Sequence, residues 1–213
     1  MPHYFPSFRS AVRHVPVTLV LIALCVANFL FVYAGAPVKW VAALTFQSFT
    51  LRGGELTFLV TEHQYWRFIT PIFLHFGWLH ITFNSLWLWE LGALIELRLG
   101  GVLLLVLVLL SAAGSNQAQA LYTGPVIFGG MSGVVYALLG FCWVYNTVQP
   151  DRTLALPRAV IIMMLVWLLF CVVAPTEQLG IGGIANAAHV GGLVLGSLLA
   201  LPVGLSARYG WWR

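Results

Sequence analysis

Two side chains that could carry out hydrolytic chemistry lie at the edges of long apolar stretches. Ser132 directly precedes the apolar run 134–148, and His189 opens the run that ends at Val203. An ionisable side chain at membrane depth is costly, so such a histidine is by default a functional candidate that needs a partner. A histidine that accepts the hydroxyl proton activates a serine as a nucleophile. The sequence therefore predicts a Ser132–His189 pair capable of acyl transfer.

The composition is that of a membrane protein. The 213 residues are 61% hydrophobic and 8% charged, and the mean hydropathy is +0.93. Soluble domains average about 25% charged residues. The net charge of +4 does not indicate a nucleic-acid partner, because the ten Lys and Arg residues are scattered near segment ends and form no basic patch.

Six stretches are long and apolar enough to cross a bilayer, which takes about 20 residues in a helix. They predict an all-α membrane protein of six transmembrane helices, a single domain over 1–213 with short tails at about 1–15 and 205–213. The predicted spans are 17–33, 79–96, 102–122, 132–148, 158–174 and 185–203.

An even number of spans places both termini on one side of the membrane. Three of the ten cations, Lys39, Arg52 and Arg67, lie in the first loop. The positive-inside rule makes the other side cytoplasmic, so spans two, four and six begin at the outer face. The cations on the side of the termini are Arg9, Arg13, Arg98, Arg152, Arg158, Arg208 and Arg213.

The first loop, about 36–78, is unusually long and rich in aromatic residues. Its aromatic and aliphatic side chains alternate with Arg52, Glu55 and Arg67. This mixture predicts short amphipathic helices in the outer interface.

Other polar residues fall at the same depth as the serine and histidine. His80 and Asn84 are four residues apart near the start of span two, so they share a helix face. They could donate hydrogen bonds into a cavity, or they could simply join helices. Gly130 and Gly133 permit close backbone approach beside Ser132. The free N–H groups at the start of span four could stabilise charge on a carbonyl oxygen.

Acidic residues and metal ligands are poorly placed for this site. The only aspartate, Asp151, follows span four, and Glu177 before span six is expected to be solvated. The sequence therefore favours a dyad over a Ser-His-Asp triad. It also argues against an aspartyl protease, which needs paired aspartates. His75 and His80 have no His-Glu-x-x-His context, so no metal is predicted.

Five pieces in order along the chain resemble the rhomboid family of intramembrane serine proteases, in particular its bacterial GlpG-type members. Their order and their distribution over the predicted spans make the set specific. The pieces are Trp66-Arg67, His80-x-x-x-Asn84, Glu96-x-Arg98, Gly130-x-Ser132-Gly133, and Ala188-His189 followed by Gly192 and Gly196. The last two glycines also form a Gly-x-x-x-Gly motif, which predicts close packing of span six on span four.

The resemblance implies a role for each matching residue. Ser132 would be the nucleophile and His189 the general base. The Asn84 side chain, the Ser132 N–H and His80 would form the oxyanion hole. The supporting residues would be Tyr136, against the His189 ring, and Gly130, Met131 and Gly133.

The resemblance also implies that the substrates are transmembrane segments of other membrane proteins. They would enter from the bilayer past span five, with Trp167 as a gate, under the loop 175–184. No cofactor or metal is implied, and the expected location is a bacterial inner membrane with the site opening outward. The alternatives are a non-catalytic rhomboid-fold scaffold or chaperone, and a small transporter using His80 and His189. A polar cluster at Ser115, Asn116, Gln117 and Gln119 departs from the family pattern and could hydrate the site.

Overall fold

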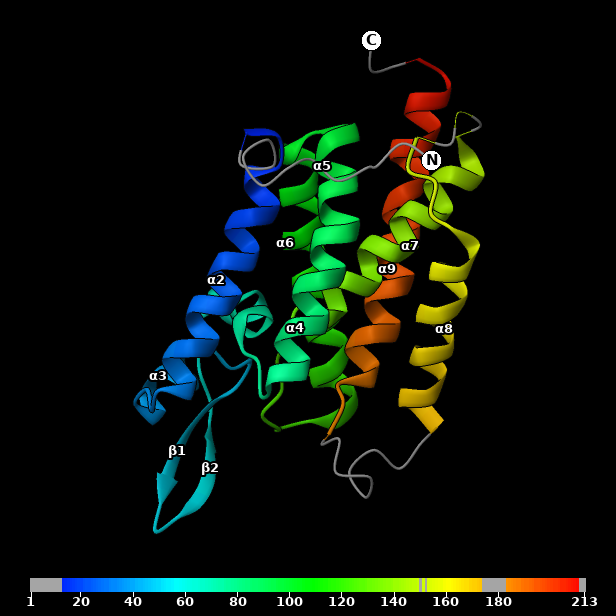
Figure 1. Ribbon diagram of the computed structural model, residues 1–213. Coiled ribbons are helices and arrows are strands. Elements are labelled where there is room, and N and C mark those ends of the chain that lie inside the picture. Colours follow the sequence, from blue (N-terminus) through cyan, green and yellow to red (C-terminus); the bar gives the residue numbers. More distant parts are fainter. Residues whose placement is uncertain (1–12, 150, 152, 174–182, 211–213) are drawn as a thin grey trace.

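The computed structural model describes residues 13–149, 151, 153–173 and 183–210, and these form a bundle of helices with a hairpin at one end (Figure 1). The bundle helices are α2 (Pro16–Tyr33), α4 (Trp78–Trp87), α5 (Ala93–Leu99), α6 (Gly101–Thr123), α7 (Ser132–Val148), α8 (Arg158–Val173) and α9 (Asn186–Arg208). Helix α7 lies in the interior, and most of its first eleven side chains are buried.

The helices fall close to the predicted spans. Within the described ranges, α2, α6 and α9 are long and apolar enough to cross a membrane, with 18, 23 and 23 residues. Helices α7 and α8 are apolar but shorter, with 17 and 16 residues. The predicted fourth span coincides with α7, and each of the others differs from its helix by a few residues at one end or the other.

The second predicted span is not one regular helix. Helix α4 passes through a π-helical turn (Leu88–Gly92) into α5. The buried Glu96 of α5 accepts hydrogen bonds from the N–H groups of Val17 and Thr18, each at 2.8 Å, and from the Thr18 hydroxyl at 2.7 Å. Glu96 therefore satisfies donors that the start of α2 leaves without helical partners.

The first loop contains a β-hairpin, so the all-α expectation is wrong there. One short helix, α3 (Val38–Leu44), precedes strands β1 (Ser48–Arg52) and β2 (Glu55–Leu59), which pair antiparallel with Phe49 opposite Phe58. The connecting Gly53 and Gly54 have φ values of 60° and 88°. A two-residue turn with positive φ at both positions favours glycine and matches the twist of a hairpin.

Arg67 anchors this loop to the bundle. Two 3-10 turns, η1 (Tyr65–Phe68) and η2 (Thr70–Phe73), follow the hairpin. The buried Arg67 guanidinium in η1 donates to the carbonyl groups of Ala42 and Thr45 at 2.6 and 2.7 Å, and to the Gln64 side chain at 2.7 Å. Burial lowers the pKa of Arg67. These bonds tie the end of α3 to the segment that leads into α4.

Helices α7 and α9 approach each other closely through glycine. Gly192 lies against the carbonyl of Gly133, and Gly196 lies against the carbonyl of Ala137. A Cβ atom at either α9 position would overlap the backbone of α7. This contact brings the first turns of the two helices together, and these turns carry the serine and the histidine.

Candidate active site

The structure brings Ser132 and His189 into direct contact. Ser132 is the first residue of α7, and His189 lies in the first turn of α9. His189 Nε2 is 2.7 Å from Ser132 Oγ, and only 6% of the histidine is exposed. At this distance the serine hydroxyl can donate to the imidazole, which is the ground-state geometry for removing its proton.

The imidazole is held by packing. His189 Nδ1 is buried and has no hydrogen-bond partner among the described residues. The Tyr136 ring lies 5.0 Å from the imidazole between ring centroids, tilted by 39°, and its hydroxyl donates to the Met164 carbonyl of α8 at 3.1 Å. Glu177, the acidic residue considered from the sequence, lies outside the described residues. The described geometry is that of a pair.

The turn before Ser132 requires glycine. Gly130 has a φ of 116°, which side chains rarely adopt, and its N–H donates to the Pro71 carbonyl at 3.0 Å. A Cβ at Gly130 would lie 2.5 Å from His80 Nε2, and one at Gly129 would lie 2.8 Å from the Pro71 carbonyl oxygen. The turn is therefore packed directly between η2 and α4.

His75 holds the next peptide of this turn, a role that sequence reasoning missed. Its Nδ1 donates to the Phe73 carbonyl, and the Met131 N–H donates to its Nε2, both at 3.4 Å. Burial, reinforced by the neighbouring His80, lowers the pKa of His75 to about 3, so the ring is a neutral acceptor at ordinary pH. The spacing to His80 gave no signal, because His75 precedes α4 and does not share its helix face.

Asn84 and His80 both lie on α4, and the His80 ring faces the turn. Asn84 is 5% exposed, and its Nδ2 donates to the His80 carbonyl at 2.9 Å. An amide nitrogen carries two hydrogens, so one donor remains for another acceptor. The His80 ring lies against Gly130. The His80 ring and the N-terminus of α7 therefore border the same small region beside Ser132.

The polar cluster of α6 faces the two site helices. The Gln119 side-chain oxygen accepts from the Ala188 N–H at 3.1 Å, directly before His189. The Ser115 hydroxyl lies against Gly133, and Asn116 Nδ2 donates to the Phe68 carbonyl at 2.9 Å. Gln119 therefore contacts Ala188, the residue before His189, and Ser115 contacts Gly133, the residue after Ser132. The sequence marked these residues as unusual but gave no partner for them.

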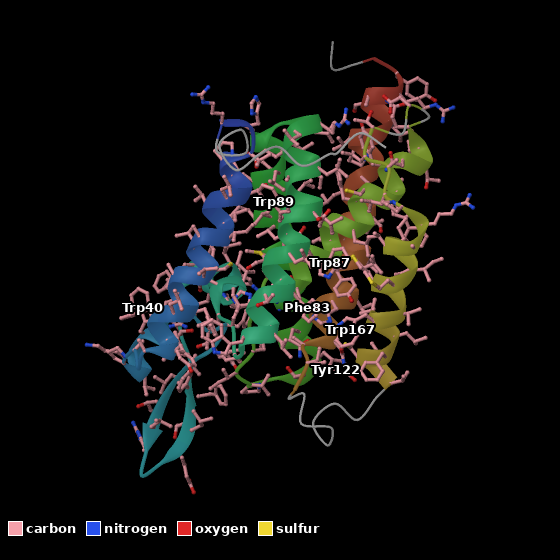
Figure 2. All side chains as sticks on the ribbon, viewed as in Figure 1. Trp40, Phe83, Trp87, Trp89, Tyr122 and Trp167 are labelled. Atoms are coloured by element: carbon pink, nitrogen blue, oxygen red, sulfur yellow. The ribbon has the colours of Figure 1, made fainter. Side chains whose placement is uncertain are left out.

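The entry side of the site is described only in part. Figure 2 shows Trp167 on α8, where it is 52% exposed and stacks on Phe170 at 5.4 Å between ring centroids. Residues 175–182 of the predicted covering loop lie outside the described residues. In the part of the chain that is described, no three His, Cys, Asp or Glu side chains gather as a metal site.

Comparison with known proteins points to one family. The family model "Rhomboid domain" matches residues 62–206. The Rhomboid protease GlpG of Serratia proteamaculans is 51% identical over 137 residues, covering 64% of this chain and 48% of that protein. The Rhomboid protease GlpG of Yersinia enterocolitica is 40% identical over 200 residues, covering 92% of this chain and 65% of that protein.

The chain thus spans about half to two thirds of the length of these curated relatives. The family match and the apolar helices identify an integral membrane protein. The matched region includes both members of the serine–histidine pair, His75, the turn before Ser132 and all of the α4, α6 and α7 contacts described above. Since the match to the rhomboid family model covers well over half of the sequence, this chain belongs to the rhomboid family.

Proposed function

We propose that this protein is an intramembrane serine endopeptidase that cuts transmembrane segments of other membrane proteins. The observation that carries the proposal is the 2.7 Å contact between His189 Nε2 and Ser132 Oγ inside an apolar helical bundle. The relatives named as rhomboid proteases support it. A scaffold that only bound its partners would not need a buried histidine aligned on a serine hydroxyl.

The reaction proceeds by acyl transfer. His189 Nε2 takes the hydroxyl proton while Ser132 Oγ forms a bond to the scissile carbonyl carbon. The tetrahedral intermediate collapses as the C–N bond breaks, and the imidazolium returns its proton to the leaving amine. Water then attacks the acyl-enzyme with His189 as the base, which releases the new carboxyl end and restores Ser132.

Charge on the tetrahedral oxygen is stabilised by donors that are already in place. The Ser132 N–H at the start of α7 has no helical partner. The second Nδ2 hydrogen of Asn84 and the His80 ring complete the oxyanion hole. Because the Asn84 side chain is already bonded to the His80 carbonyl before substrate binds, little reorganisation of this donor accompanies the reaction.

Six spans would put both termini on one side of the membrane, and by the positive-inside rule that side is the cytoplasm of a bacterial cell, with the site toward the outer face of the inner membrane. In support, α2 begins and α9 ends at one end of the bundle, opposite the hairpin (Figure 1). Of the cations that define this orientation, Arg9, Arg152 and Arg213 lie outside the described residues. Helix α8 lies at the edge of the bundle beside α9, so substrates enter laterally past α8 and Trp167.

Replacement of the nucleophile tests the proposal directly. Ser132→Ala should abolish cleavage of a transmembrane substrate and labelling by a fluorophosphonate, while thermal unfolding stays near that of the wild type. Ser197→Ala is the matched control, because the Ser197 hydroxyl only bonds back to the Leu193 carbonyl of its own helix, at 2.8 Å. Cleavage that survives in Ser132→Ala would refute the mechanism. A well-folded wild type that neither labels nor cleaves would favour the scaffold.

The oxyanion assignment has its own test. Asn84→Ala should keep Ser132 labelling but lower kcat by about 10²–10³, the usual effect of losing one oxyanion donor. Wild-type kcat in Asn84→Ala would remove this residue from the oxyanion hole and leave the Ser132 N–H and His80.

A further inference from the structure

An apolar groove lies between α2 and α6, on a side of the bundle away from the serine–histidine pair. Its volume is about 370 Å³, within the ~300–1,000 Å³ typical of ligand pockets. Val20 and Leu24 of α2 and Leu105 and Leu109 of α6 line its walls, and Ile72 of η2 lies at its floor. Every lining residue is apolar. Ordered water has no partners in such a groove.

The depth of the groove corresponds to one leaflet of a bilayer. Its α2 wall runs from Pro16 to Leu24, about 12 Å along the helix, against a half-thickness of about 15 Å for the hydrocarbon core. Val20, Leu24, Leu105 and Leu109 are 42–56% exposed, so the groove opens toward the surrounding lipid. Ile72 and Phe73 of η2 also line it. With the termini in the cytoplasm, as proposed above, it opens in the cytoplasmic leaflet.

A positive charge lies at the shallow end of this groove. Arg13 is exposed and precedes Pro16 by three residues. Helix α6 begins at the same end of the bundle as α2 (Figure 1), and Arg98 comes three residues before its first residue. Basic residues where spanning helices meet the cytoplasmic surface attract anionic lipid headgroups.

We propose that this groove binds one acyl chain of an anionic glycerophospholipid, with the phosphate of the lipid next to Arg13. A flat helix face contacts a lipid chain on one side, whereas this groove contacts it on three, from α2, α6 and η2. The combination of a wholly apolar groove and a cation at its mouth matches a chain and a phosphate joined in one molecule. This distinguishes a bound lipid from the general lipid annulus.

The bound chain also supports the active site, a consequence that rests on the proposed proteolytic function. Phe73 and Ile72 line the groove, and the backbone of the same turn faces the site. The Pro71 carbonyl accepts the Gly130 N–H, and the Phe73 carbonyl accepts from His75 and from Asn28. A lipid chain therefore fills the space behind the segment that holds the turn before Ser132.

Photolabelling tests the lipid site without requiring proteolysis. The purified protein in nanodiscs is exposed to phosphatidylglycerol carrying a diazirine on one acyl chain, and adducts on residues 16–24 are counted by mass spectrometry. Leu109→Trp fills the groove and should remove most of these adducts. Leu110→Trp is the matched control, because Leu110 is the next residue of α6, is similarly exposed at 48% against 42%, and does not line the groove.

Each outcome decides a part of the proposal. Equal adducts in wild type, Leu109→Trp and Leu110→Trp would mean an annular lipid only and would overturn the site. Arg13→Gln should raise the concentration of unlabelled phosphatidylglycerol needed for half-displacement by roughly fivefold. Equal labelling by the matching phosphatidylcholine probe would refute the anionic headgroup. Unchanged cleavage in phosphatidylcholine-only vesicles would refute the support of the active site while leaving the lipid site intact.

Discussion

Replacing Gly196 by alanine should weaken the contact that brings the two site helices together. The added methyl group would overlap the Ala137 carbonyl, and the backbone of a helix cannot turn aside as a flexible side chain can. We take about 3 kcal/mol for this overpacking. An alanine in place of glycine in a helix returns about 1 kcal/mol. The net loss of about 2 kcal/mol should lower the Tm by about 4–8 °C in a protein of this size.

Activity should fall by more than stability alone would require. Separating α7 from α9 moves Ser132 relative to His189, and a displacement of about 1 Å at a reacting group costs on the order of 100-fold in rate. The assays are thermal unfolding followed by tryptophan fluorescence, and kcat for a fluorogenic transmembrane substrate below the Tm.

Gly204→Ala provides the matched control. A Cβ at Gly204 in the same helix would meet Val148 at an ordinary 3.4 Å, so this variant should be as stable as the wild type or slightly more so, with unchanged kcat. If Gly196→Ala matched Gly204→Ala in both Tm and kcat, the inferred close contact between α7 and α9 would be wrong.

Three further substitutions test individual contacts. Tyr136→Phe removes the hydrogen bond to Met164 and should cost about 1 kcal/mol of unfolding free energy with kcat nearly unchanged; a large loss of kcat would show that the hydroxyl itself is needed. Gln119→Leu leaves the buried Ala188 N–H without its acceptor and should cost about 1–3 kcal/mol of unfolding free energy; a Tm equal to that of the wild type would contradict this. Because the pKa of His75 falls from 6.5 to about 3 on folding, only the unfolded chain binds a proton there between these values. The stability that His75 contributes is complete above pH 6.5 and is lost as the pH falls toward 3, so His75→Gln should flatten the acid side of a Tm–pH curve measured from pH 4 to 7, and a parallel curve would argue against it.

Much of the helical framework could be predicted from the sequence. Apolar runs of the right length indicated α2, α6, α7, α8 and α9, because a chain that crosses a bilayer must satisfy its backbone groups internally. The predicted start of the fourth span at Ser132 is confirmed as the start of α7. His80 and Asn84 both lie in α4, as the predicted second span required, and their role in an oxyanion hole stays a prediction.

Other elements depended on contacts that no local pattern encodes. The hairpin was missed because aromatic residues and charges fit an interfacial helix as well as a strand, and the signal was the Gly53-Gly54 pair. The π-helical turn inside the second span has no local pattern that distinguishes it from the α-helix on either side. His75 was set aside as a poor metal ligand, although its position before α4 places it against Met131.

The sequence by itself determined that this is a membrane protein. It also determined which residues could carry out the chemistry and at which helix ends those residues lie. Those conclusions rest on hydropathy and helical periodicity, which are local properties of the chain. Only the tertiary structure decided that His189 Nε2 lies 2.7 Å from Ser132 Oγ and that Gln119, His75 and Tyr136 hold their surroundings. The physical reason is that these distances depend on how closely α7 and α9 approach. That approach is set by the fit of glycine against backbone at positions more than 50 residues apart in the sequence.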